Sequence, residues 1–231
     1  MKQICKLVVM LLLAFTAGVQ AQLVTYPESL NPGMPHNDDY TVRVRIPGGE
    51  WKDLFEYNVQ VDMDNVQNAS MVQFDMGSAV EVMVKKNNGS VREVTIRPLS
   101  KGIEYKQIQN AILFTLEKPQ YLSIEFDGDR LHNLHLFANP LETEKYDKET
   151  KGIMYFGPGV HRPKDLPNNQ IRIPGNTTVY LAPGAVVKAK LLVDKAENVR
   201  IIGRGILDHP IRGIEVTDSK NVLIDGITVV N

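Results

Sequence analysis

The segment after residue 190 repeats itself at a fixed spacing. The stretch LLVDKAENVRIIG, residues 191–203, aligns with IEVTDSKNVLIDG, residues 214–226, so that matching positions lie 23 residues apart. The matching pairs are Leu191 with Ile214, Val193 with Val216, Asn198 with Asn221, Val199 with Val222, Ile201 with Ile224 and Gly203 with Gly226. A constant period of this length indicates a repeat protein, in which each repeat packs on its neighbours.

The repeat unit favours a parallel β-helix. It consists of short runs of Val, Ile and Leu separated by Gly, Asn and Asp, and it leaves no room for the helix of a leucine-rich repeat. In a parallel β-helix the strands of one coil pair with those of the preceding coil, about 4.8 Å away. The sequence therefore predicts that Val199 stacks on Val222, and Ile201 on Ile224, inside the coils.

The repeated asparagines predict a turn at the same place in each coil. Asn adopts the left-handed backbone conformation more readily than most residues, and stacked Asn side chains can hydrogen-bond along the stack. Asn198 and Asn221 are expected to form such a ladder. A weaker copy of the motif at residues 176–179 lies 22 residues before Asn198 and extends the prediction to the preceding coil.

Residues 23–137 follow a different pattern, in which apolar and polar residues alternate. In residues 41–46, TVRVRI, the side chains of Val42, Val44 and Ile46 fall on one face and those of Arg43 and Arg45 on the other. The same period of two recurs in residues 59–63 and 80–84. Half-buried strands at short spacing predict an antiparallel β-sandwich.

Two dipeptides predict tight hairpins in this region. Asn88-Gly89 would join strands at 80–84 and 91–96, and Asp127-Gly128 would join strands at 121–126 and 131–137. Both dipeptides supply the positive φ angles that tight hairpin turns need.

A polar, charged stretch separates the two patterns. Residues 139–151, NPLETEKYDKETK, are interpreted as a linker. The expected organisation is a sandwich domain over residues 22–138, this linker, and the start of a β-helix over residues 152–231.

The first 21 residues are interpreted as a secretory signal peptide. Lys2 and Lys6 precede the apolar run LVVMLLLAF, and the sequence VQA at positions 19–21 places cleavage after Ala21. The protein is therefore expected to be secreted or periplasmic. The apolar run is too short to span a bilayer, and no later segment is apolar enough to do so.

Composition excludes several function classes. The charge is nearly balanced, with 26 Lys and Arg against 27 Asp and Glu, so nothing indicates binding to nucleic acid or to an anionic membrane. The single cysteine, Cys5, precedes the apolar run, which argues against a lipoprotein and leaves the mature chain without a thiol nucleophile or thiolate ligand. A monomer without cofactor or metal is expected.

Two stretches resemble known carbohydrate-active families. The run NTTVYLAPGAVVKAKLLVDKAENVRIIGRGILDH, residues 176–209, followed by NVLIDGITVVN, residues 221–231, resembles the first coils of polygalacturonase-type glycoside hydrolases of family 28. The run LHNLHLFANP, residues 131–140, is similar to the N-terminal sandwich of the dextranase and isopullulanase family, family 49. The resemblance implies an antiparallel β-sandwich followed by the first coils of a right-handed, pectin-lyase-like parallel β-helix.

The resemblance also implies a function. These families are inverting hydrolases of polysaccharides, in which one Asp carboxyl protonates the leaving oxygen and another activates water. Their catalytic motifs follow the strand on which this sequence ends, so the catalytic carboxylates are expected beyond Asn231. The sequence is therefore interpreted as the N-terminal part of an exported polysaccharide-degrading glycoside hydrolase, polygalacturonase- or dextranase-like, and as inactive by itself. The uncapped last coil agrees with this, because native solenoids cover such ends.

Two other classes share the β-helix. A polysaccharide lyase would cleave by β-elimination, and a non-catalytic carbohydrate-binding or adhesin protein would carry no clustered carboxylates on its coils. Each class takes a polysaccharide as its partner. No substrate-binding residues are assigned from the sequence.

Several residues have the chemistry of a site but are better explained otherwise. His132 and His135 form H-x-x-H, which on a strand points to opposite faces and argues against a metal site. The run DMDN at 62–65 begins like a calcium loop but lacks its Gly and Glu, since Gln67 and Gln73 stand there.

Asp208-His209, which ends a predicted coil strand, is interpreted as a turn, with a distal sugar subsite as the alternative. Trp51 could stack on a sugar ring, although a lone aromatic in a sandwich is usually part of the core. Asn68, Asn88 and Asn176 each begin a glycosylation sequon.

Overall fold

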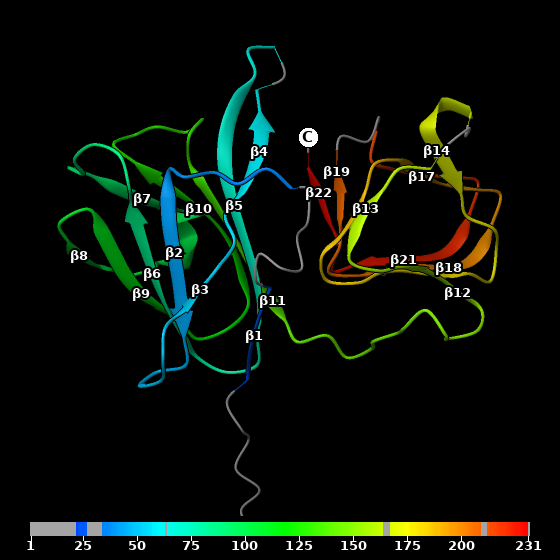
Figure 1. The fold of residues 1–231 in the computed structure, drawn as a ribbon, viewed down its shortest axis with the longest axis horizontal. Coiled ribbons are helices and arrows are strands. Elements are labelled where there is room, and N and C mark those ends of the chain that lie inside the picture. The colour runs from blue at the N-terminus through cyan, green and yellow to red at the C-terminus, as the bar shows by residue number, and fades with distance from the viewer. Residues whose placement is uncertain (1–21, 27–33, 63, 164–166, 209–211, 231) are drawn as a thin grey trace, which may run out of the picture.

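The computed structural model describes residues 22–26, 34–62, 64–163, 167–208 and 212–230. These residues form an almost entirely β protein with two units side by side, a sandwich and a parallel β-helix (Figure 1). The signal peptide predicted for residues 1–21 lies outside the described residues.

Two sheets make up the sandwich. The six-stranded sheet has the order β1-β5-β11-β10-β7, with β4 also paired to β5. The five-stranded sheet has the order β3-β2-β6-β9-β8. The strands of the first are β1 (Leu23–Thr25), β4 (Tyr57–Val61), β5 (Gln67–Met76), β7 (Val94–Arg97), β10 (Gln120–Phe126) and β11 (Leu134–Pro140). Those of the second are β2 (Tyr40–Arg45), β3 (Lys52–Asp53), β6 (Val80–Lys86), β8 (Lys106–Ile108) and β9 (Ala111–Leu116).

The predicted alternation produces the sandwich core. Val42 and Val44 of β2 are fully buried while Arg43 between them is exposed, and the valines of β6 are buried in the same way. The described pairs are antiparallel, as expected, except that β11 runs parallel to β5. This parallel pair arises because the β10–β11 hairpin adds to the free edge of β5, whose other edge is taken by β4 and β1.

One of the two predicted hairpins forms, although residues 127–133 make a longer connection than the tight turn expected, and the other is wrong. Asp127 and Gly128 both have positive φ, and they connect β10 to its antiparallel partner β11. The Asn88-Gly89 turn instead carries the chain from β6 in one sheet to β7 in the other. Both edges of β6 are already paired, with β2 and β9. In addition, the Asp127 carboxylate accepts hydrogen bonds from the backbone of Arg92 and Glu93, which holds the chain against the six-stranded sheet.

The β-helix consists of three parallel sheets whose strands come from successive coils. The first contains β12 (Ile153–Phe156), β15 (Thr178–Leu181), β18 (Glu197–Gly203) and β21 (Lys220–Asp225). The second contains β13 (Gly159–His161), β16 (Ala185–Val187), β19 (Ile206–Asp208) and β22 (Thr228–Val230). The third contains β14 (Gln170–Arg172), β17 (Lys190–Asp194) and β20 (Ile214–Thr217). Two short 3-10 turns complete the described elements, η2 (Leu99–Lys101) and η3 (Pro167–Asn169).

The stacking predicted from the period is confirmed. Val199 pairs with Val222, and Ile201 with Ile224, in register. The strand pairs of β17 and β20 likewise place Leu191 on Ile214 and Val193 on Val216. The sequence period therefore identified which residues of neighbouring coils contact one another.

The asparagine ladder is also confirmed. Asn176, Asn198 and Asn221 have φ angles of 56°, 58° and 52°. The amide of Asn198 donates to Asn176 Oδ1 over 3.0 Å, and the amide of Asn221 donates to Asn198 Oδ1 over 2.7 Å. Asn176 precedes β15, whereas Asn198 and Asn221 are the second residues of β18 and β21, so the ladder stabilises a left-handed backbone position at the start of these strands instead of a separate turn.

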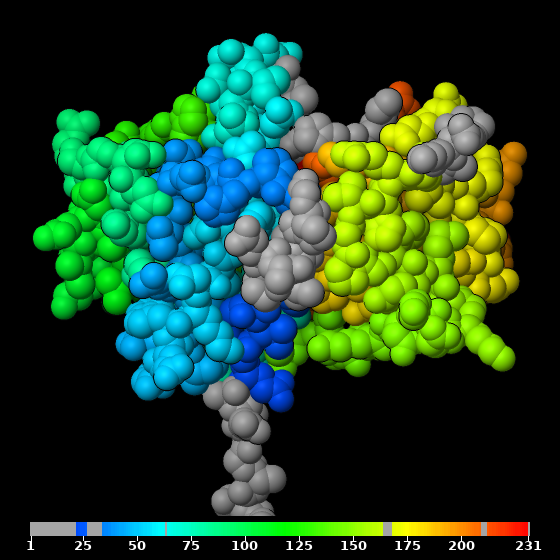
Figure 2. Space-filling model, viewed as in Figure 1, coloured from blue at the N-terminus to red at the C-terminus, as the bar shows by residue number. Residues whose placement is uncertain are grey.

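The two units pack together through apolar side chains, and Figure 2 shows their surfaces in contact. Tyr57 and Met71 on the outer face of the six-stranded sheet cluster with Val186 and Ile206 of the β-helix. The linker was expected over residues 139–151, but Asn139 and Pro140 belong to β11, and residues 141–151 run along the β-helix (Figure 1). There Glu144 forms an ion pair with Arg200. The sheet that contains β13, β16, β19 and β22 therefore faces the sandwich.

Candidate functional site

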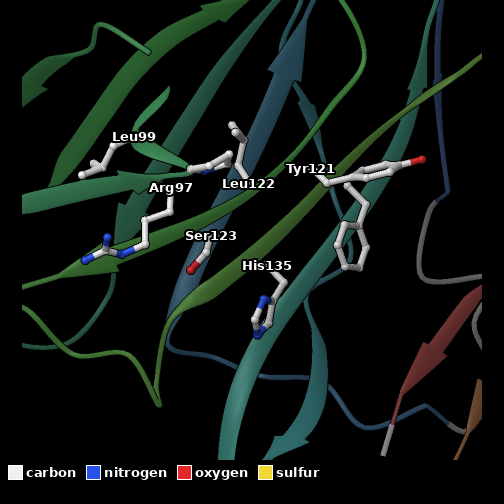
Figure 3. Close-up of a pocket in the computed structure, with 8 residues that line it drawn as sticks. Arg97, Leu99, Tyr121, Leu122, Ser123 and His135 are labelled. Atoms are coloured by element: carbon white, nitrogen blue, oxygen red, sulfur yellow. The ribbon is translucent and has the colours of Figure 1, made fainter. Parts of the chain in front are cut away.

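An open groove lies on the outer face of the six-stranded sheet, beside the part that the β-helix covers. Its volume is about 650 Å³. Figure 3 shows the side chains that line it; the lining residues are Arg97, Pro98, Leu99, Tyr121, Leu122, Ser123, His135 and Phe137.

Strand pairing positions these side chains. In the β10–β11 hairpin, Tyr121 lies opposite Phe137, and Ser123 lies opposite His135. Ser123 also pairs with Arg97 of β7, so Arg97, Ser123 and His135 form a row across three strands. Because side chains alternate along a strand, these residues face outward while their neighbours fill the sandwich core.

The aromatic part of the groove is formed by Tyr121 and Phe137. The Tyr121 side chain is 57% exposed. Its ring meets that of Phe137 edge to face, with centroids 5.6 Å apart and planes at 90°. This contact orients the Tyr121 ring while leaving much of its surface open to solvent.

The polar part of the groove contains Ser123, Arg97 and His135, which differ in their hydrogen-bond partners. Ser123 Oγ accepts a hydrogen bond of 2.6 Å from the Asn133 amide. Arg97 Nε donates over 2.7 Å to Oε1 of Glu125, whose side chain is buried. The His135 ring makes no hydrogen bond with the described part of the chain, and burial lowers its pKa, so the imidazole is neutral at pH 7.

Two smaller pockets extend the groove toward the β-helix. One, of about 210 Å³, is lined by Tyr121 and Phe137 together with residues 226–229. The other, of about 250 Å³, joins His135 and Phe137 to Val229 and Val230 of β22. The groove therefore leads from η2 across the sandwich to the last described coil.

The structure separates the two histidines of the H-x-x-H motif. The sequence placed both on one strand, but His132 precedes β11 and lies in its loop. Its Nδ1 lies 2.9 Å from Asp129 Oδ2, and its backbone N–H donates to Asp129 Oδ1. His135 faces the groove instead. Within the described residues, no group of three or more His, Cys, Asp or Glu side chains could hold a metal ion.

Asp62 and Asn65 belong to the turn between β4 and β5. The backbone N–H of Asn65 donates to the Asp62 carbonyl over 3.1 Å, and Asp62 has a φ of 52°. The loop that resembled a calcium site is thus a hairpin turn in the part that the structure describes; Met63 lies outside the described residues.

The interpretation of Asp208 as a turn residue is wrong. Asp208 is the last residue of β19, 4% exposed, and its carboxylate is paired with Lys188, which directly follows β16 in the preceding coil. Leu207 fills the interior of the β-helix, so alternation places Asp208 on the outer face with Ile206, where Lys188 of the preceding coil compensates its charge. His209 lies outside the described residues.

Trp51 is not a core residue. Its side chain is partly exposed, and the Arg45 guanidinium lies 4.3 Å from the centroid of its ring. The ring therefore already has a partner. The three sequon asparagines are exposed, and the Asn176 side chain belongs to the ladder described above.

Tyr121, Ser123 and Phe137 were not identified as site residues from the sequence. Alternation within the Asp127-Gly128 hairpin places them on one face, which was a usable signal. The sequence did not show that the β-helix covers only part of this face and leaves the groove open.

Comparisons with known proteins agree with the fold. No protein-family model matches the sequence, and no curated protein matches it. Dex49A from Penicillium minioluteum, a dextranase with a β-sandwich and a β-helix, is similar in structure, with a TM-score of 0.60 and 21% sequence identity over 76% of this chain. The chain spans 46% of the length of Dex49A.

The chain is therefore a β-sandwich joined to a parallel β-helix, as expected from the sequence. The resemblance to dextranases is supported at the level of fold, whereas the resemblance to polygalacturonases stays a prediction. No helix among the described residues is long and apolar enough to cross a membrane.

Proposed function

We propose that this chain is part of an exported glycoside hydrolase that degrades a polysaccharide by inversion, like a dextranase or a polygalacturonase. The observation that carries the proposal is the likeness to Dex49A, which extends over 76% of the chain and joins a sandwich to a β-helix in one architecture. A fold hosts many functions, so the activity rests on this analogy and on the chemistry that follows.

The catalytic pair of an inverting hydrolase needs two carboxyl groups separated by about 6.5–9.5 Å, which leaves room for the attacking water. Asp208 is unsuited to such a role, because it is buried and paired with Lys188. Glu144 is likewise engaged by Arg200. We place the catalytic carboxylates on coils beyond residue 231, in keeping with the motif order of the resembling families.

The test is an assay of the native protein and of the 231-residue chain on dextran and on polygalacturonate. The native protein should release reducing sugar from one polysaccharide, and the 231-residue chain should release none. Hydrolysis by the 231-residue chain would show that the location proposed for the catalytic residues, beyond residue 231, is wrong. Unsaturated products would identify a lyase instead.

The groove gives one specific reason to consider a second function, that of a non-catalytic carbohydrate-binding protein. An exposed aromatic ring beside neutral hydrogen-bonding groups can hold a sugar without cleaving it. Glycan binding by the native protein, with no product from any polysaccharide, would favour this function.

A further inference from the structure

We propose that the groove on the six-stranded sheet binds an uncharged polysaccharide chain, with one sugar ring on Tyr121 and neighbouring hydroxyl groups bonded to Ser123 and His135. That the ligand is a polysaccharide rests on the proposed function. The location on the sandwich and the preference for an uncharged chain come from the groove itself.

Tyr121 provides a flat apolar surface for a sugar ring. A pyranose ring has a face of C–H groups that is removed from water when it packs on an aromatic ring. The edge-to-face contact with Phe137 fixes the Tyr121 ring before a ligand arrives. Binding therefore costs little side-chain entropy at this position.

Together, Ser123 and His135 provide both hydrogen-bond donors and a hydrogen-bond acceptor for a ligand. The Ser123 oxygen already accepts from Asn133, so its proton remains available for donation. The His135 ring, neutral and without a partner in the described chain, offers one donor and one acceptor. Sugar hydroxyl groups both donate and accept, so they match this pair.

The charges of the groove favour an uncharged ligand. Arg97, the charged residue among its lining side chains, donates to buried Glu125, which compensates its positive charge. Arg130 lies 3.9 Å from the same carboxylate, but it is not among the lining residues, and its 72% exposed side chain is screened by solvent. An anionic polyuronate would therefore gain little from Arg97, while an uncharged chain would lose nothing.

The direction of the groove agrees with a chain-like ligand. One adjoining pocket shares Tyr121 and Phe137 with the groove, the other shares His135 and Phe137, and both reach residues of β22. A chain that lies on the sandwich would thus lead toward the β-helix, where the proposed hydrolase carries its catalytic coils. Phe137, which lines the groove, also packs against the apolar cluster between the two units.

The test is a calorimetric titration of the 231-residue chain with isomaltohexaose, cellohexaose and the anionic hexasaccharide of galacturonic acid. We expect one of the uncharged hexasaccharides to bind more tightly than the anionic one. Tyr121→Ala should weaken this binding about tenfold, corresponding to about 1.4 kcal/mol, and Tyr121→Phe should preserve it. His135→Ala should weaken it as well. Tyr105→Ala, which removes a partly exposed tyrosine elsewhere on the sandwich, serves as the matched control and should leave affinity unchanged.

Circular dichroism of each variant establishes that it is folded, and His135→Ala keeps the test valid if Tyr121→Ala does not fold. The proposal is overturned if neither uncharged hexasaccharide binds, if the anionic one binds more tightly, or if Tyr105→Ala weakens binding as much as Tyr121→Ala. It is also overturned if the chain self-associates through this face, seen in sedimentation as dimers that Tyr121→Ala abolishes.

Failure here is distinguishable from failure of the proposed function. If the native protein hydrolyses a polysaccharide but Tyr121→Ala leaves its glycan affinity unchanged, only the proposal of glycan binding in the groove is refuted. If the protein binds a glycan through Tyr121 but hydrolyses no polysaccharide, only the proposed hydrolase function is refuted.

Discussion

Arg204 of the β-helix donates from Nε to Oδ1 of Asp75 in the sandwich, over 2.8 Å. The two side chains are 4% and 2% exposed, so the ion pair is buried between the two units. The same guanidinium donates to the carbonyl oxygen of Pro140 at the end of β11 and to that of Gly203. One side chain of the third coil thus holds the β5 and β11 strands of the sandwich in place.

Removing Arg204 is expected to destabilise the protein strongly. Arg204→Ala leaves the Asp75 carboxylate buried without its cation, which costs about 3–5 kcal/mol in comparable cases. Urea denaturation measures the change in the free energy of unfolding. Arg172→Ala is the matched control, because the ion pair of Arg172 with Asp194 is exposed and should contribute about 1 kcal/mol or less. Equal losses in the two variants would contradict the structural role of Arg204.

Because Asn198 belongs to the asparagine ladder, we expect its replacement by Ala to reduce stability more than its replacement by Gly. Asn198→Ala removes two hydrogen bonds and places Ala in the left-handed conformation, for a combined loss of about 2 kcal/mol or more. Asn198→Gly removes the same bonds but accepts the backbone conformation, so it should lose roughly half as much. Urea denaturation of both variants checks the order. A Gly variant less stable than the Ala variant would show that the φ angle is not the reason for Asn.

Gly203 is predicted to tolerate no side chain. A Cβ atom there would lie 2.0 Å from the Leu181 carbonyl oxygen, and its φ is 125°. Gly203→Ala should therefore prevent the coils from stacking, with a loss of soluble protein or of more than about 3 kcal/mol. Gly89→Ala is the control, since its φ is also positive but nothing lies within 4 Å, and it should cost about 1–2 kcal/mol. Soluble yield and thermal unfolding distinguish the two, and a stable Gly203→Ala variant would contradict the close contact between coils.

The contributions of Glu142 and Glu144 to stability are expected to change with pH in opposite directions. Burial raises the pKa of Glu142, whose Oε1 accepts a hydrogen bond from Tyr180 Oη. The stability that protonated Glu142 contributes is present below its unfolded pKa, about 4.3, and is lost as pH rises through the folded pKa. Glu142→Gln should therefore stabilise the protein at pH 7, with a smaller gain in acid.

Glu144 behaves in the opposite way. Hydrogen bonds from Arg200 lower its pKa to about 2. Its contribution is present above the unfolded pKa and is lost as pH falls through the folded value. Glu144→Gln should thus destabilise the protein at pH 7. Urea midpoints of both variants at neutral and acidic pH measure the two signs, and changes of equal sign at pH 7 would contradict the assignment.

The β-helix was largely predictable because its physical constraint is local and repeated. Each coil must place apolar residues inside at the same positions, so the spacing between Val199 and Val222 reveals their contact directly. The asparagine ladder follows from the same logic. The pairing of Asp208 with Lys188 was missed, because the two residues lie in different coils and the spacing of coils changes there.

The sandwich and the groove were only partly predictable. Alternation identified the buried face of each strand, but it did not show which strands share a sheet, and the Asn88-Gly89 turn was assigned to a hairpin for that reason. The groove depends on which outward-facing residues the β-helix leaves uncovered. Tyr121 and Val59 both face outward from the same sheet, and tertiary packing covers one and exposes the other.

The function we propose for the protein that contains this chain is that of an inverting polysaccharide hydrolase. Proton nuclear magnetic resonance of freshly released sugar, recorded while the native protein acts on dextran or polygalacturonate, tests it most directly. We expect the new reducing end to appear first with the anomeric configuration opposite to that of the cleaved bond. Retention of configuration, an unsaturated product, or no product from either polysaccharide would contradict it.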